Sequence, residues 1–326
     1  MCTRVVYSGT NGMVATGRSM DWKTEMHSNL WAFPRGMMRN GEAGENSLKW
    51  TSRYGSVVTS AFEIASTDGM NEKGLVANLL WLPETQYPVR DESKPGLAIT
   101  AWVQYMLDNF ATVEEAVSYI DEDTFQVVSD MMPDGSRLAT LHLSISDAAG
   151  DCAIFEYVGG GLTVYHSKDY KVMTNSPTYD KQLALNEYWK TIGGLSFLPG
   201  TNRAADRFAR ASFYINALPK TDDERIAVAS VFSVVRNASV PYGISTSESP
   251  EISTTQWRTV SESKSLRYFF ESSLTPNTFW VDLRDLDLAE GAPVLKLSIA
   301  NGEMYHGNTA KEFKIALPFK FMGVRG

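Results

Sequence analysis

Residues 2–22 read CTRVVYSGTNGMVATGRSMDW, and this stretch predicts how the fold begins. Its two runs rich in β-branched residues, Cys2–Ser8 and Met13–Trp22, are typical of strands. The residues between them, Gly9–Gly12, end in the Asn-Gly pair that favours a tight hairpin turn. We therefore expect an antiparallel hairpin. Such pairing brings the end of the second run back beside the first residues of the chain.

Blocks of strand and helix patterns follow the hairpin. Strand patterns are predicted at residues 29–33, 56–65, 74–82, 138–146, 152–157, 162–166, 171–174, 256–262, 266–272, 278–282 and 294–299, with a polar turn at Thr67-Asp68-Gly69. Helical patterns are predicted at residues 95–110, 112–121, 177–191, 202–216 and 221–235. This block order favours an α+β fold in which two antiparallel sheets pack face to face with helices outside. No repeat or composition shift marks a boundary, so we expect a single domain over residues 1–326.

The composition excludes two classes of partner. The 326 residues carry 30 Lys and Arg against 38 Asp and Glu, a net charge of −8. The basic residues form no run that would neutralise a phosphate backbone, so nucleic acid is not an expected partner. The longest apolar stretches fall short of the roughly 20 residues that a membrane-spanning helix requires, so no membrane insertion is expected.

The cysteine count and the first residues leave the compartment open. Two cysteines, Cys2 and Cys152, cannot form a disulfide framework, although one bridge is arithmetically possible. The first ten residues lack the basic and apolar regions of a secretory signal. We expect a cytoplasmic protein if Met1 is native, and a periplasmic protein if Met1 replaces a removed signal peptide.

The thiol at position 2 is the unusual feature of the sequence. Removal of Met1, which the small Cys side chain permits, would place a nucleophile and a base on the same residue, Cys2. A free α-amino group has a pKa of about 7.7–8.0, so it can accept the thiol proton directly or through one water. In the predicted hairpin, Arg18 and Asp21 lie beside Cys2. Asp21 could then orient the α-ammonium group, and Arg18 could stabilise a thiolate.

Sequence motifs for other chemistries are missing. There is no Gly-x-Gly-x-x-Gly, phosphate-binding loop, Gly-x-Ser-x-Gly or His-Glu-x-x-His. His142 and His166 lie in strand patterns, where a hydrogen-bonded structural role is expected, so neither a metal nor a cofactor is predicted. Two alternatives stay open. One is a hydrolase that uses Cys152 with His142 or His166, and the other is a non-catalytic protein that binds a hydrophobic small molecule and retains Met1.

Several motifs resemble, in order, those of one family. They are Cys2-Thr3-Arg4, Gly17-Arg18-Ser19-Met20-Asp21-Trp22, Asp68-Gly69-Met70-Asn71-Glu72-Lys73-Gly74-Leu75, Met173-Thr174-Asn175-Ser176-Pro177, Leu198-Pro199-Gly200 and Asp206-Arg207-Phe208-Ala209-Arg210. The chain resembles the choloylglycine hydrolase group of N-terminal nucleophile hydrolases, which contains penicillin V acylases and conjugated bile salt hydrolases. The resemblance implies an αββα four-layer sandwich and hydrolysis of a small acyl amide without a cofactor.

The resemblance also implies roles for the residues that match. Cys2 would be the nucleophile and its amine the base. The side-chain NH₂ of Asn175 and the backbone N–H of Trp81 would bind the oxyanion of the tetrahedral intermediate. Arg207 would lie beside the nucleophile, as the matching arginine does in family members.

The substrate class follows from the residue at position 81. By resemblance, bile salt hydrolases have Asn there and Gram-positive penicillin V acylases have Tyr, whereas Trp81 with Trp22 resembles the Gram-negative branch. Members of that branch cleave phenoxymethylpenicillin and often long-chain N-acyl homoserine lactones. Two indoles would form an apolar wall for a phenoxyacetyl ring or an acyl chain, and Met131 and Met132 would shape the same pocket. Conjugated bile salts remain the alternative substrates.

The resemblance implies a homotetramer, with one departure. Asn175 and Arg207 lie only 32 positions apart, so the long assembly excursion of the Gram-positive members is absent or much shortened. We therefore expect a homo-oligomer in which contacts carried by that excursion are in doubt.

Overall fold

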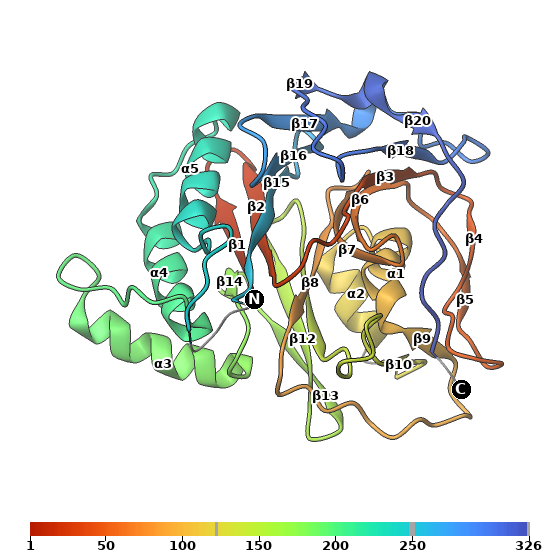
Figure 1. Cartoon of the computed structure of the whole chain (residues 1–326), viewed down its shortest axis with the longest axis horizontal. Coiled ribbons are helices and arrows are strands. Elements are labelled where there is room, and N and C mark those ends of the chain that lie inside the picture. The colour runs from red at the N-terminus through yellow and green to blue at the C-terminus, as the bar shows by residue number, and fades with distance from the viewer. Residues whose placement is uncertain (121–122, 248–251, 325–326) are drawn as a thin grey trace.

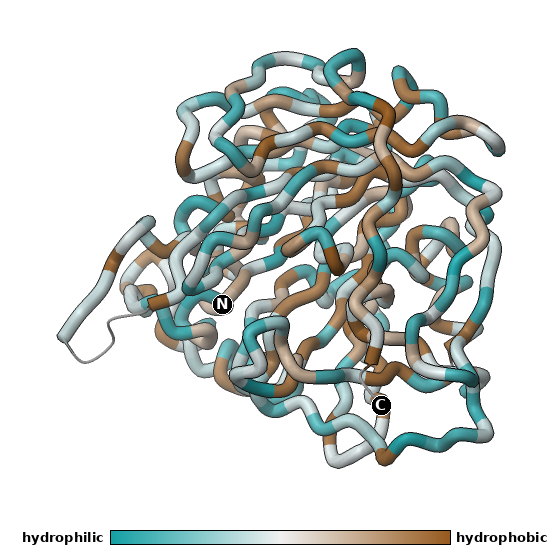
Figure 2. The backbone as a smooth tube through the Cα atoms, turned by 45° about the vertical axis from the view of Figure 1, so that its right-hand side comes forward, coloured by the Kyte–Doolittle hydropathy of each residue, from teal (hydrophilic) through white to brown (hydrophobic). Residues whose placement is uncertain are grey.

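Figure 1 shows the computed structural model, which describes residues 1–120, 123–247 and 252–324. Two large sheets lie in the middle of the molecule, and a group of helices covers the outer face of each sheet. This is the α+β arrangement that the block order of strand and helix patterns predicted. Figure 2 shows hydrophobic stretches passing through the middle of the molecule, whereas many of the outer loops are hydrophilic.

The first two strands form the expected hairpin. They are β1 (Cys2–Ser8) and β2 (Val14–Trp22), and their register places Cys2 opposite Met20. The turn residues Asn11 and Gly12 have positive φ angles of 49° and 75°, as the tight hairpin turn requires.

The first sheet contains both strands of the hairpin in its interior. In spatial order its seven strands are β14 (Val172–Met173), β1, β2, β15 (Thr254–Glu262), β16 (Arg267–Ser272), β17 (Thr278–Asp282) and β19 (Gly307–Asn308). Because β14 flanks β1 and β15 flanks β2, the hairpin has no free edge. The first residues of the chain are therefore buried.

The second sheet faces the first. In spatial order its nine strands are β13 (Gly161–His166), β12 (Cys152–Val158), β11 (Leu141–Ser146), β8 (Val76–Trp81), β7 (Ala65–Asn71), β6 (Ser56–Ala61), β3 (Leu30–Phe33), β18 (Leu295–Leu297) and β20 (Lys314–Ile315). Two small pairs accompany it, β9 (Gly96–Ala98) with β10 (Gln126–Val128) and β4 (Met38–Asn40) with β5 (Lys49–Thr51). The short strands β4, β5, β10, β19 and β20 were not predicted.

Five α-helices complete the layers in the described part of the chain. They are α1 (Trp102–Asn109), α2 (Val113–Ile120), α3 (Tyr179–Ile192), α4 (Ala204–Ala217) and α5 (Glu224–Asn237). On one side α4 packs against β1, and α5 packs against β1, β2 and β15. On the other side α1 packs against β6, β7 and β8, and α2 packs against β12.

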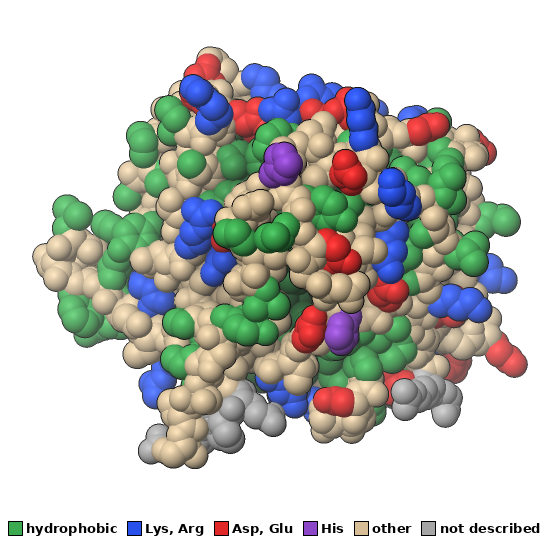
Figure 3. All heavy atoms as spheres, turned by 45° about the horizontal axis from the view of Figure 1, so that its top comes forward, with side chains coloured by type: hydrophobic (Ala, Val, Ile, Leu, Met, Phe, Trp, Pro, Cys, Tyr) green, Lys and Arg blue, Asp and Glu red, His purple; other side chains and the backbone are tan. Residues whose placement is uncertain are grey.

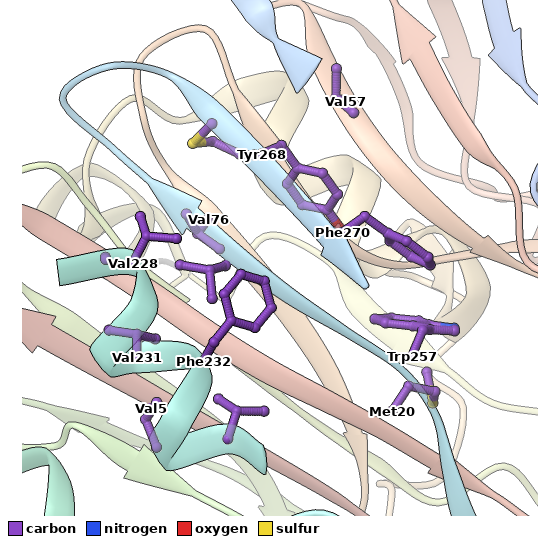
Figure 4. Close-up of a cluster of buried hydrophobic side chains, with 14 of the residues drawn as sticks. Val5, Met20, Val57, Val76, Val228, Val231, Phe232, Trp257, Tyr268 and Phe270 are labelled. Carbon is purple, nitrogen blue, oxygen red and sulfur yellow. The ribbon is translucent and has the colours of Figure 1, made fainter. Parts of the chain in front are cut away.

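Apolar side chains fill the space between the layers. Figure 4 shows one cluster, in which Val231 and Phe232 of α5 lie near Val5 of β1, and in which Tyr268 and Phe270 of β16 also take part. A second cluster, which includes Trp102 and Phe155, lies between the second sheet and the helices α1 and α2. Removal of this apolar surface from water is the main driving force for assembly of the layers.

The predicted turn at Thr67–Gly69 is wrong, because these residues lie inside β7. The chain reverses instead at Phe62 and Glu63, which both have a φ angle of 52°. That turn contains neither Gly nor Pro, so the sequence gives no turn signal there. Gly69 is needed for close packing, since a Cβ atom would lie 2.7 Å from the carbonyl oxygen of Val57.

The predicted helix over residues 95–110 begins later than expected. Gly96–Ala98 forms β9, Ile99–Ala101 forms a 3₁₀ turn, and the α-helix begins at Trp102. Pairing of β9 with β10 overrides the helical periodicity of the first residues. Asp121, the predicted end of the next helix, lies outside the described residues.

Within the described ranges, no helix has the length and apolar character needed to cross a bilayer. Figure 3 shows a face on which Lys and Arg side chains are interspersed with Asp and Glu, rather than gathered in a basic patch.

Gly17 of β2 allows α5 to approach the first sheet. A Cβ atom at this position would lie 2.5 Å from Cγ1 of Val231 and 2.8 Å from Cγ2 of Val235. We expect Gly17→Val to lower the free energy of unfolding by about 1–3 kcal/mol, because α5 must move away from the sheet. Urea unfolding measures the change. The control is Gly200→Ala, where a Cβ atom meets no other atom within 4 Å, and equal losses in both variants would contradict the prediction.

Candidate active site

Cys2 lies at the start of β1 and is 3% exposed. Its sulfur is 3.6 Å from Nη2 of Arg18 and 3.8 Å from the sulfur of Met20. The antiparallel register explains the proximity, because Cys2 pairs with Met20, and Arg18 lies two residues before Met20 in β2, on the same face. The expected juxtaposition of Cys2 and Arg18 is confirmed.

The guanidinium group of Arg18 is held between two strands of the second sheet. Nη1 donates to the carbonyl oxygen of Thr67 in β7, and Nη2 donates to that of Leu79 in β8, each at 2.9 Å. Nη1 also lies 3.4 Å from a carboxylate oxygen of Asp68. Because Arg18 is fully buried and fixed at several atoms, its charge is presented to Cys2 in one geometry.

Asp68 is the buried counter-charge of Arg18, and the sequence analysis missed it. Its carboxylate accepts hydrogen bonds from the Tyr268 hydroxyl, from Nδ2 of Asn78 at 2.7 Å and from Oγ1 of Thr259 at 3.3 Å. Burial raises the pKa of Asp68, and the charge of Arg18 opposes that change. The residues around Asp68 therefore fix the arginine that contacts the thiol. The available signal was the Asp68–Leu75 motif, in which Asp68 had been assigned to a turn.

Asn175 follows β14 and faces the nitrogen of Cys2. Its Oδ1 accepts from the backbone N–H of Cys2 at 2.6 Å and from Nη2 of Arg207 at 2.7 Å. Two donors on this atom identify it as the oxygen, so the orientation of the side-chain amide is fixed. Nδ2 donates one hydrogen to the carbonyl oxygen of Trp81 at 2.6 Å, which leaves its second N–H for another acceptor.

The backbone N–H of Trp81 points to the same side of β8 as its carbonyl group. The next residue, Leu82, donates to the carbonyl oxygen of Thr140 at 3.0 Å, toward β11. Backbone groups alternate along a strand, so the N–H of Trp81 is directed away from β11. The contact with Asn175 is made by the carbonyl group of Trp81, and the expected role of its N–H as an oxyanion donor stays a prediction.

Arg207 of α4 connects the helix to the first residues of β1. Its Nη1 donates to the carbonyl oxygen of Cys2 and to Oγ1 of Thr3, both at 2.6 Å, and its Nε donates to the carbonyl oxygen of Asn202 at 3.0 Å. A carboxylate oxygen of Asp21 lies 3.8 Å from Nη1. Burial lowers the pKa of Arg207, and Asp21 opposes this effect. The proximity of Arg207 to Cys2, implied by the resemblance, is thus present in the structure.

Met1 is attached in this structure, so the expected contact between Asp21 and the α-ammonium of Cys2 stays a prediction. The Met1 ammonium donates to the backbone carbonyl of Asp21 at 2.7 Å, not to its carboxylate, because Met1 extends the pairing of β1 with β2. The carboxylate accepts from Oγ1 of Thr255 at 2.7 Å. Burial lowers the pKa of the Met1 amino group, whereas the charges of Cys2 and Asp21 raise it. While Met1 is attached, the nitrogen of Cys2 is an amide, and removal of Met1 would convert it into an amine.

His142 has the hydrogen-bonded structural role that was expected. Its Nδ1 lies 2.8 Å from Oε1 of Glu156, and its Nε2 lies 3.0 Å from the carbonyl oxygen of Thr174. The other carboxylate oxygen of Glu156 accepts from the backbone N–H of Tyr179 at 2.9 Å. This buried network fixes the backbone immediately before Asn175.

Cys152 has a separate environment. It packs with Val6 and Val14, and its sulfur lies 3.8 Å from the carbonyl oxygen of Gly150. Burial raises the pKa of the Cys152 thiol. His166 pairs with Asp151 at 2.8 Å. Among the described residues, no histidine is hydrogen-bonded to Cys152, so the structure does not bring together the groups of the alternative hydrolase site.

An apolar cavity opens beside the sulfur of Cys2. The space between its walls, counted together with the part that is open solvent, is about 800 Å³, and its lining includes Cys2, Trp22, Trp81 and Met132. The ring centroids of Trp22 and Trp81 are 5.6 Å apart, with the planes inclined at 54°. Both indoles therefore form one wall of the cavity that contains the thiol, as expected.

The prediction that both Met131 and Met132 shape the pocket is wrong for Met131. Met132 lines the cavity, but Met131 does not and is 38% exposed. Met131 forms an isolated β-bridge with Leu138, and consecutive side chains of an extended segment point to opposite sides. The two neighbouring methionines therefore cannot both face the cavity.

The sequence analysis also missed the wall formed by Met322, Gly323 and Val324. The backbone N–H of Met322 donates to the carbonyl oxygen of Ile64 at 2.9 Å, and its own carbonyl accepts from Oγ1 of Thr100 at 2.8 Å. These contacts fix the segment against the second sheet. No motif or periodic pattern in the sequence indicated this placement.

Comparisons with known proteins identify the family of the chain. The family model of linear amide C–N hydrolases, choloylglycine hydrolase family, matches residues 2–296. The chain belongs to this family. It is therefore a hydrolase of linear amide C–N bonds, as the resemblance implied.

Relatives within the choloylglycine hydrolase family include proteins of two named activities. The chain is 50% identical to a penicillin V acylase from Pectobacterium atrosepticum, over 99% of this chain and 92% of that protein. It is 28% identical to a bile salt hydrolase/transferase from Clostridium perfringens, over 74% of this chain and 80% of that protein.

A solved structure supports the fold of the choloylglycine hydrolase family. Penicillin V acylase from Agrobacterium tumefaciens matches with a TM-score of 0.93 and 56% identity, covering 99% of this chain and 100% of that chain. The predicted αββα sandwich is thereby confirmed.

The two cysteines should differ in reactivity. We expect iodoacetamide to label Cys2 before Cys152 at neutral pH, because Cys2 lines the cavity and faces a cation, whereas Cys152 is sealed in the core. Mass spectrometry of the two peptides over time measures the rates.

Arg18→Met should slow the labelling of Cys2 about tenfold, because the thiolate loses the cation beside it. Near-UV circular dichroism checks that this variant remains folded. If Cys152 were labelled as fast as Cys2 in the wild type, the prediction that Cys2 is the more reactive thiol would be contradicted, whatever Arg18→Met shows.

Proposed function

We propose that the protein is an N-terminal cysteine amidohydrolase that cleaves the side-chain amide of phenoxymethylpenicillin. The observation that carries the proposal is the position of Cys2, whose sulfur borders an apolar cavity and whose nitrogen contacts Asn175. The high identity to two penicillin V acylases supports the substrate class.

Removal of Met1 first converts the protein into its active form, and the catalytic reaction follows. The free amine of Cys2 takes the thiol proton, and the thiolate attacks the amide carbonyl carbon. The carbonyl oxygen becomes an oxyanion, which accepts from the second N–H of Asn175 and from the backbone N–H of Trp81. Collapse of this intermediate breaks the C–N bond, and the Cys2 ammonium protonates the departing amine. Water, activated by the amine, then hydrolyses the thioester to release phenoxyacetate.

The charged residues have separate roles in this proposal. Arg18, 3.6 Å from the sulfur, stabilises the thiolate. Arg207 fixes Asn175 and the carbonyl group of Cys2, so that nucleophile and oxyanion donor keep their relative positions. Asp21 balances the charge of Arg207. Once Met1 is removed, the negative charge of Asp21 would stabilise the protonated α-amine of Cys2.

The cavity suits an apolar acyl group. Trp22 and Trp81 would pack against the phenoxy ring, and Met132 would contact its edge. The same apolar walls would accept the acyl chain of N-acyl homoserine lactones, which we propose as a second substrate class.

We further propose that the protein self-associates through α3 and the segment that joins it to α4. Tyr188, Leu195 and Phe197 in this region are 62%, 96% and 56% exposed. In Figure 1 this region lies at the outer edge of the molecule. Burial of these side chains against a second copy would remove an apolar patch from water.

Intact mass and hydrolysis test the proposed function. We expect the mass of the expressed protein to lack one methionine, and we expect the wild type to release phenoxyacetate from phenoxymethylpenicillin. Cys2→Ala should lose this activity, because it removes the nucleophile. Cys152→Ala is the control and should retain it. Retention of Met1, or equal activity in Cys2→Ala and the wild type, would refute the N-terminal mechanism.

Arg207 and Arg210, on the same helix, offer a matched comparison. Arg207→Lys keeps the positive charge, but a lysine cannot contact Cys2, Thr3 and Asn175 together. Asn175, the proposed oxyanion donor, then loses its support, so kcat should fall about 10²-fold or more. Arg210 donates to the carbonyl oxygens of Pro199 and Thr201 instead.

We expect Arg210→Lys to lower stability while leaving kcat close to the wild-type value. Steady-state kinetics and thermal unfolding of both variants separate the two effects. A kcat that falls equally in Arg207→Lys and Arg210→Lys would show that Arg207 acts through general stability.

A further inference from the structure

An arginine outside the motifs lies over the two indoles of the cavity. Arg137 belongs to the loop between β10 and β11, and it is exposed. Its guanidinium carbon is 4.1 Å from the ring centroid of Trp81 and 5.7 Å from that of Trp22. Its backbone carbonyl accepts from the N–H of Met132 at 2.7 Å, which ties the loop back to the cavity wall. A positive charge therefore lies against the two indoles that line the cavity, and Arg137 itself is not part of the lining.

The charge of Arg137 has no protein counter-ion in the described part of the chain. No carboxylate there forms an ion pair with its guanidinium group. The nearby carboxylate of Asp134 accepts instead from the hydroxyl and the backbone N–H of Ser136, at 2.7 and 3.0 Å. These hydrogen bonds lower the pKa of Asp134, with a smaller contribution from Arg137.

Stacking on the indoles fixes the plane of the guanidinium, and its N–H groups make no hydrogen bond to the part of the protein that the structure describes. The faces of Trp rings attract a cation electrostatically, and the flat guanidinium of Arg stacks on them well. The five N–H donors lie in the plane of the group and match the two oxygens of a carboxylate. Arg137 is thus preorganised to bind an anion that lies beside the indole wall.

The position of the thiol shows which part of a substrate would meet this charge. The acyl group, being apolar, takes the buried part of the cavity, where Leu79 and Ile99 are 4% and 3% exposed. The amine on the other side of the scissile bond must then extend toward solvent, where Arg137 lies.

We infer that Arg137 binds a carboxylate on the leaving amine and so selects acyl amides of amino acids over neutral acyl amides. The inference rests on the proposed function, and it deepens that function. Phenoxymethylpenicillin carries a carboxylate on its amine portion, whereas the lactone of an acyl homoserine lactone is uncharged. Arg137 is therefore expected to favour the penicillin and simple N-acyl amino acids over the lactones.

A pair of substrates with the same acyl group isolates this contact. The substrates are N-phenoxyacetylglycine and its neutral amide, N-phenoxyacetylglycinamide. Arg137→Met keeps an unbranched apolar stem over the indoles but removes the charge, and Arg137→Lys keeps the charge. The control, Arg225→Gln, removes one positive charge from α5, at a side chain that is 91% exposed and does not line the cavity.

We expect Arg137→Met to raise KM for the carboxylate substrate about fivefold to tenfold with little change in kcat. KM for the neutral amide should not change, because this substrate has no carboxylate for Arg137 to bind. Arg137→Lys should retain most of the preference for the carboxylate substrate, because it keeps the charge. Arg225→Gln should have the KM values of the wild type for both substrates. Equal changes for both substrates would overturn the inference, since they would show that Arg137 only covers the indoles. Unchanged KM values would overturn it as well.

Binding to the Cys2→Ala variant separates this inference from the proposed function. Quenching of indole fluorescence would report the Kd of each compound without turnover, and Arg137→Met would be introduced into the same background. If the wild type does not hydrolyse phenoxymethylpenicillin, the proposed function fails, whatever the two compounds show. A Kd for the carboxylate that weakens fivefold or more with Arg137→Met, while that of the amide does not, would still support the role of Arg137. The role of Arg137 would be refuted if the Kd of the carboxylate compound were the same for Cys2→Ala and for Cys2→Ala with Arg137→Met.

Discussion

The nitrogen of Cys2 is buried, and its hydrogen bond to Asn175 is the constraint on which the rest of the site depends. A buried backbone donor without a partner is costly, so this contact fixes Asn175 against the first residue of β1. Arg207 donates to the same oxygen of Asn175 and thereby sets the position of α4 relative to the sheet. Cys2, Asn175 and α4 are thus positioned relative to one another by a single acceptor atom.

Buried charges surround this contact in two pairs. Arg18 faces Asp68 at 3.4 Å, and Arg207 faces Asp21 at 3.8 Å, and all four side chains are fully buried. Loss of one member leaves its partner uncompensated in the interior, which typically costs about 3–5 kcal/mol. The groups that would tune the thiol are therefore also part of the stability of the fold, and substitutions among them affect both properties.

The predictability of the site follows from sequence separation. Local pairing in a hairpin with a clear turn signal placed Arg18 beside Cys2 from the residues alone. Asn175 and Arg207 reach Cys2 only through tertiary packing, and family resemblance, not periodicity, identified them. Asp68 was missed, because a Thr-Asp-Gly sequence has the composition of a turn although it lies within β7. The prediction that Met131 shapes the pocket was wrong for a related reason. The orientation of Met131 depends on a β-bridge to Leu138 that no sequence pattern indicates.

The cavity is closed by residues from opposite ends of the described chain. Cys2 lines one side, Met322–Val324 line another, and β15 joins the hairpin from far along the sequence. Contacts between distant parts of a chain form late and slow the folding reaction. A ribosome must therefore synthesise the chain at least as far as Val324 before this cavity can take shape. Translation that stops ahead of Met322 would yield a protein that carries the thiol but lacks part of the wall against which a substrate would pack.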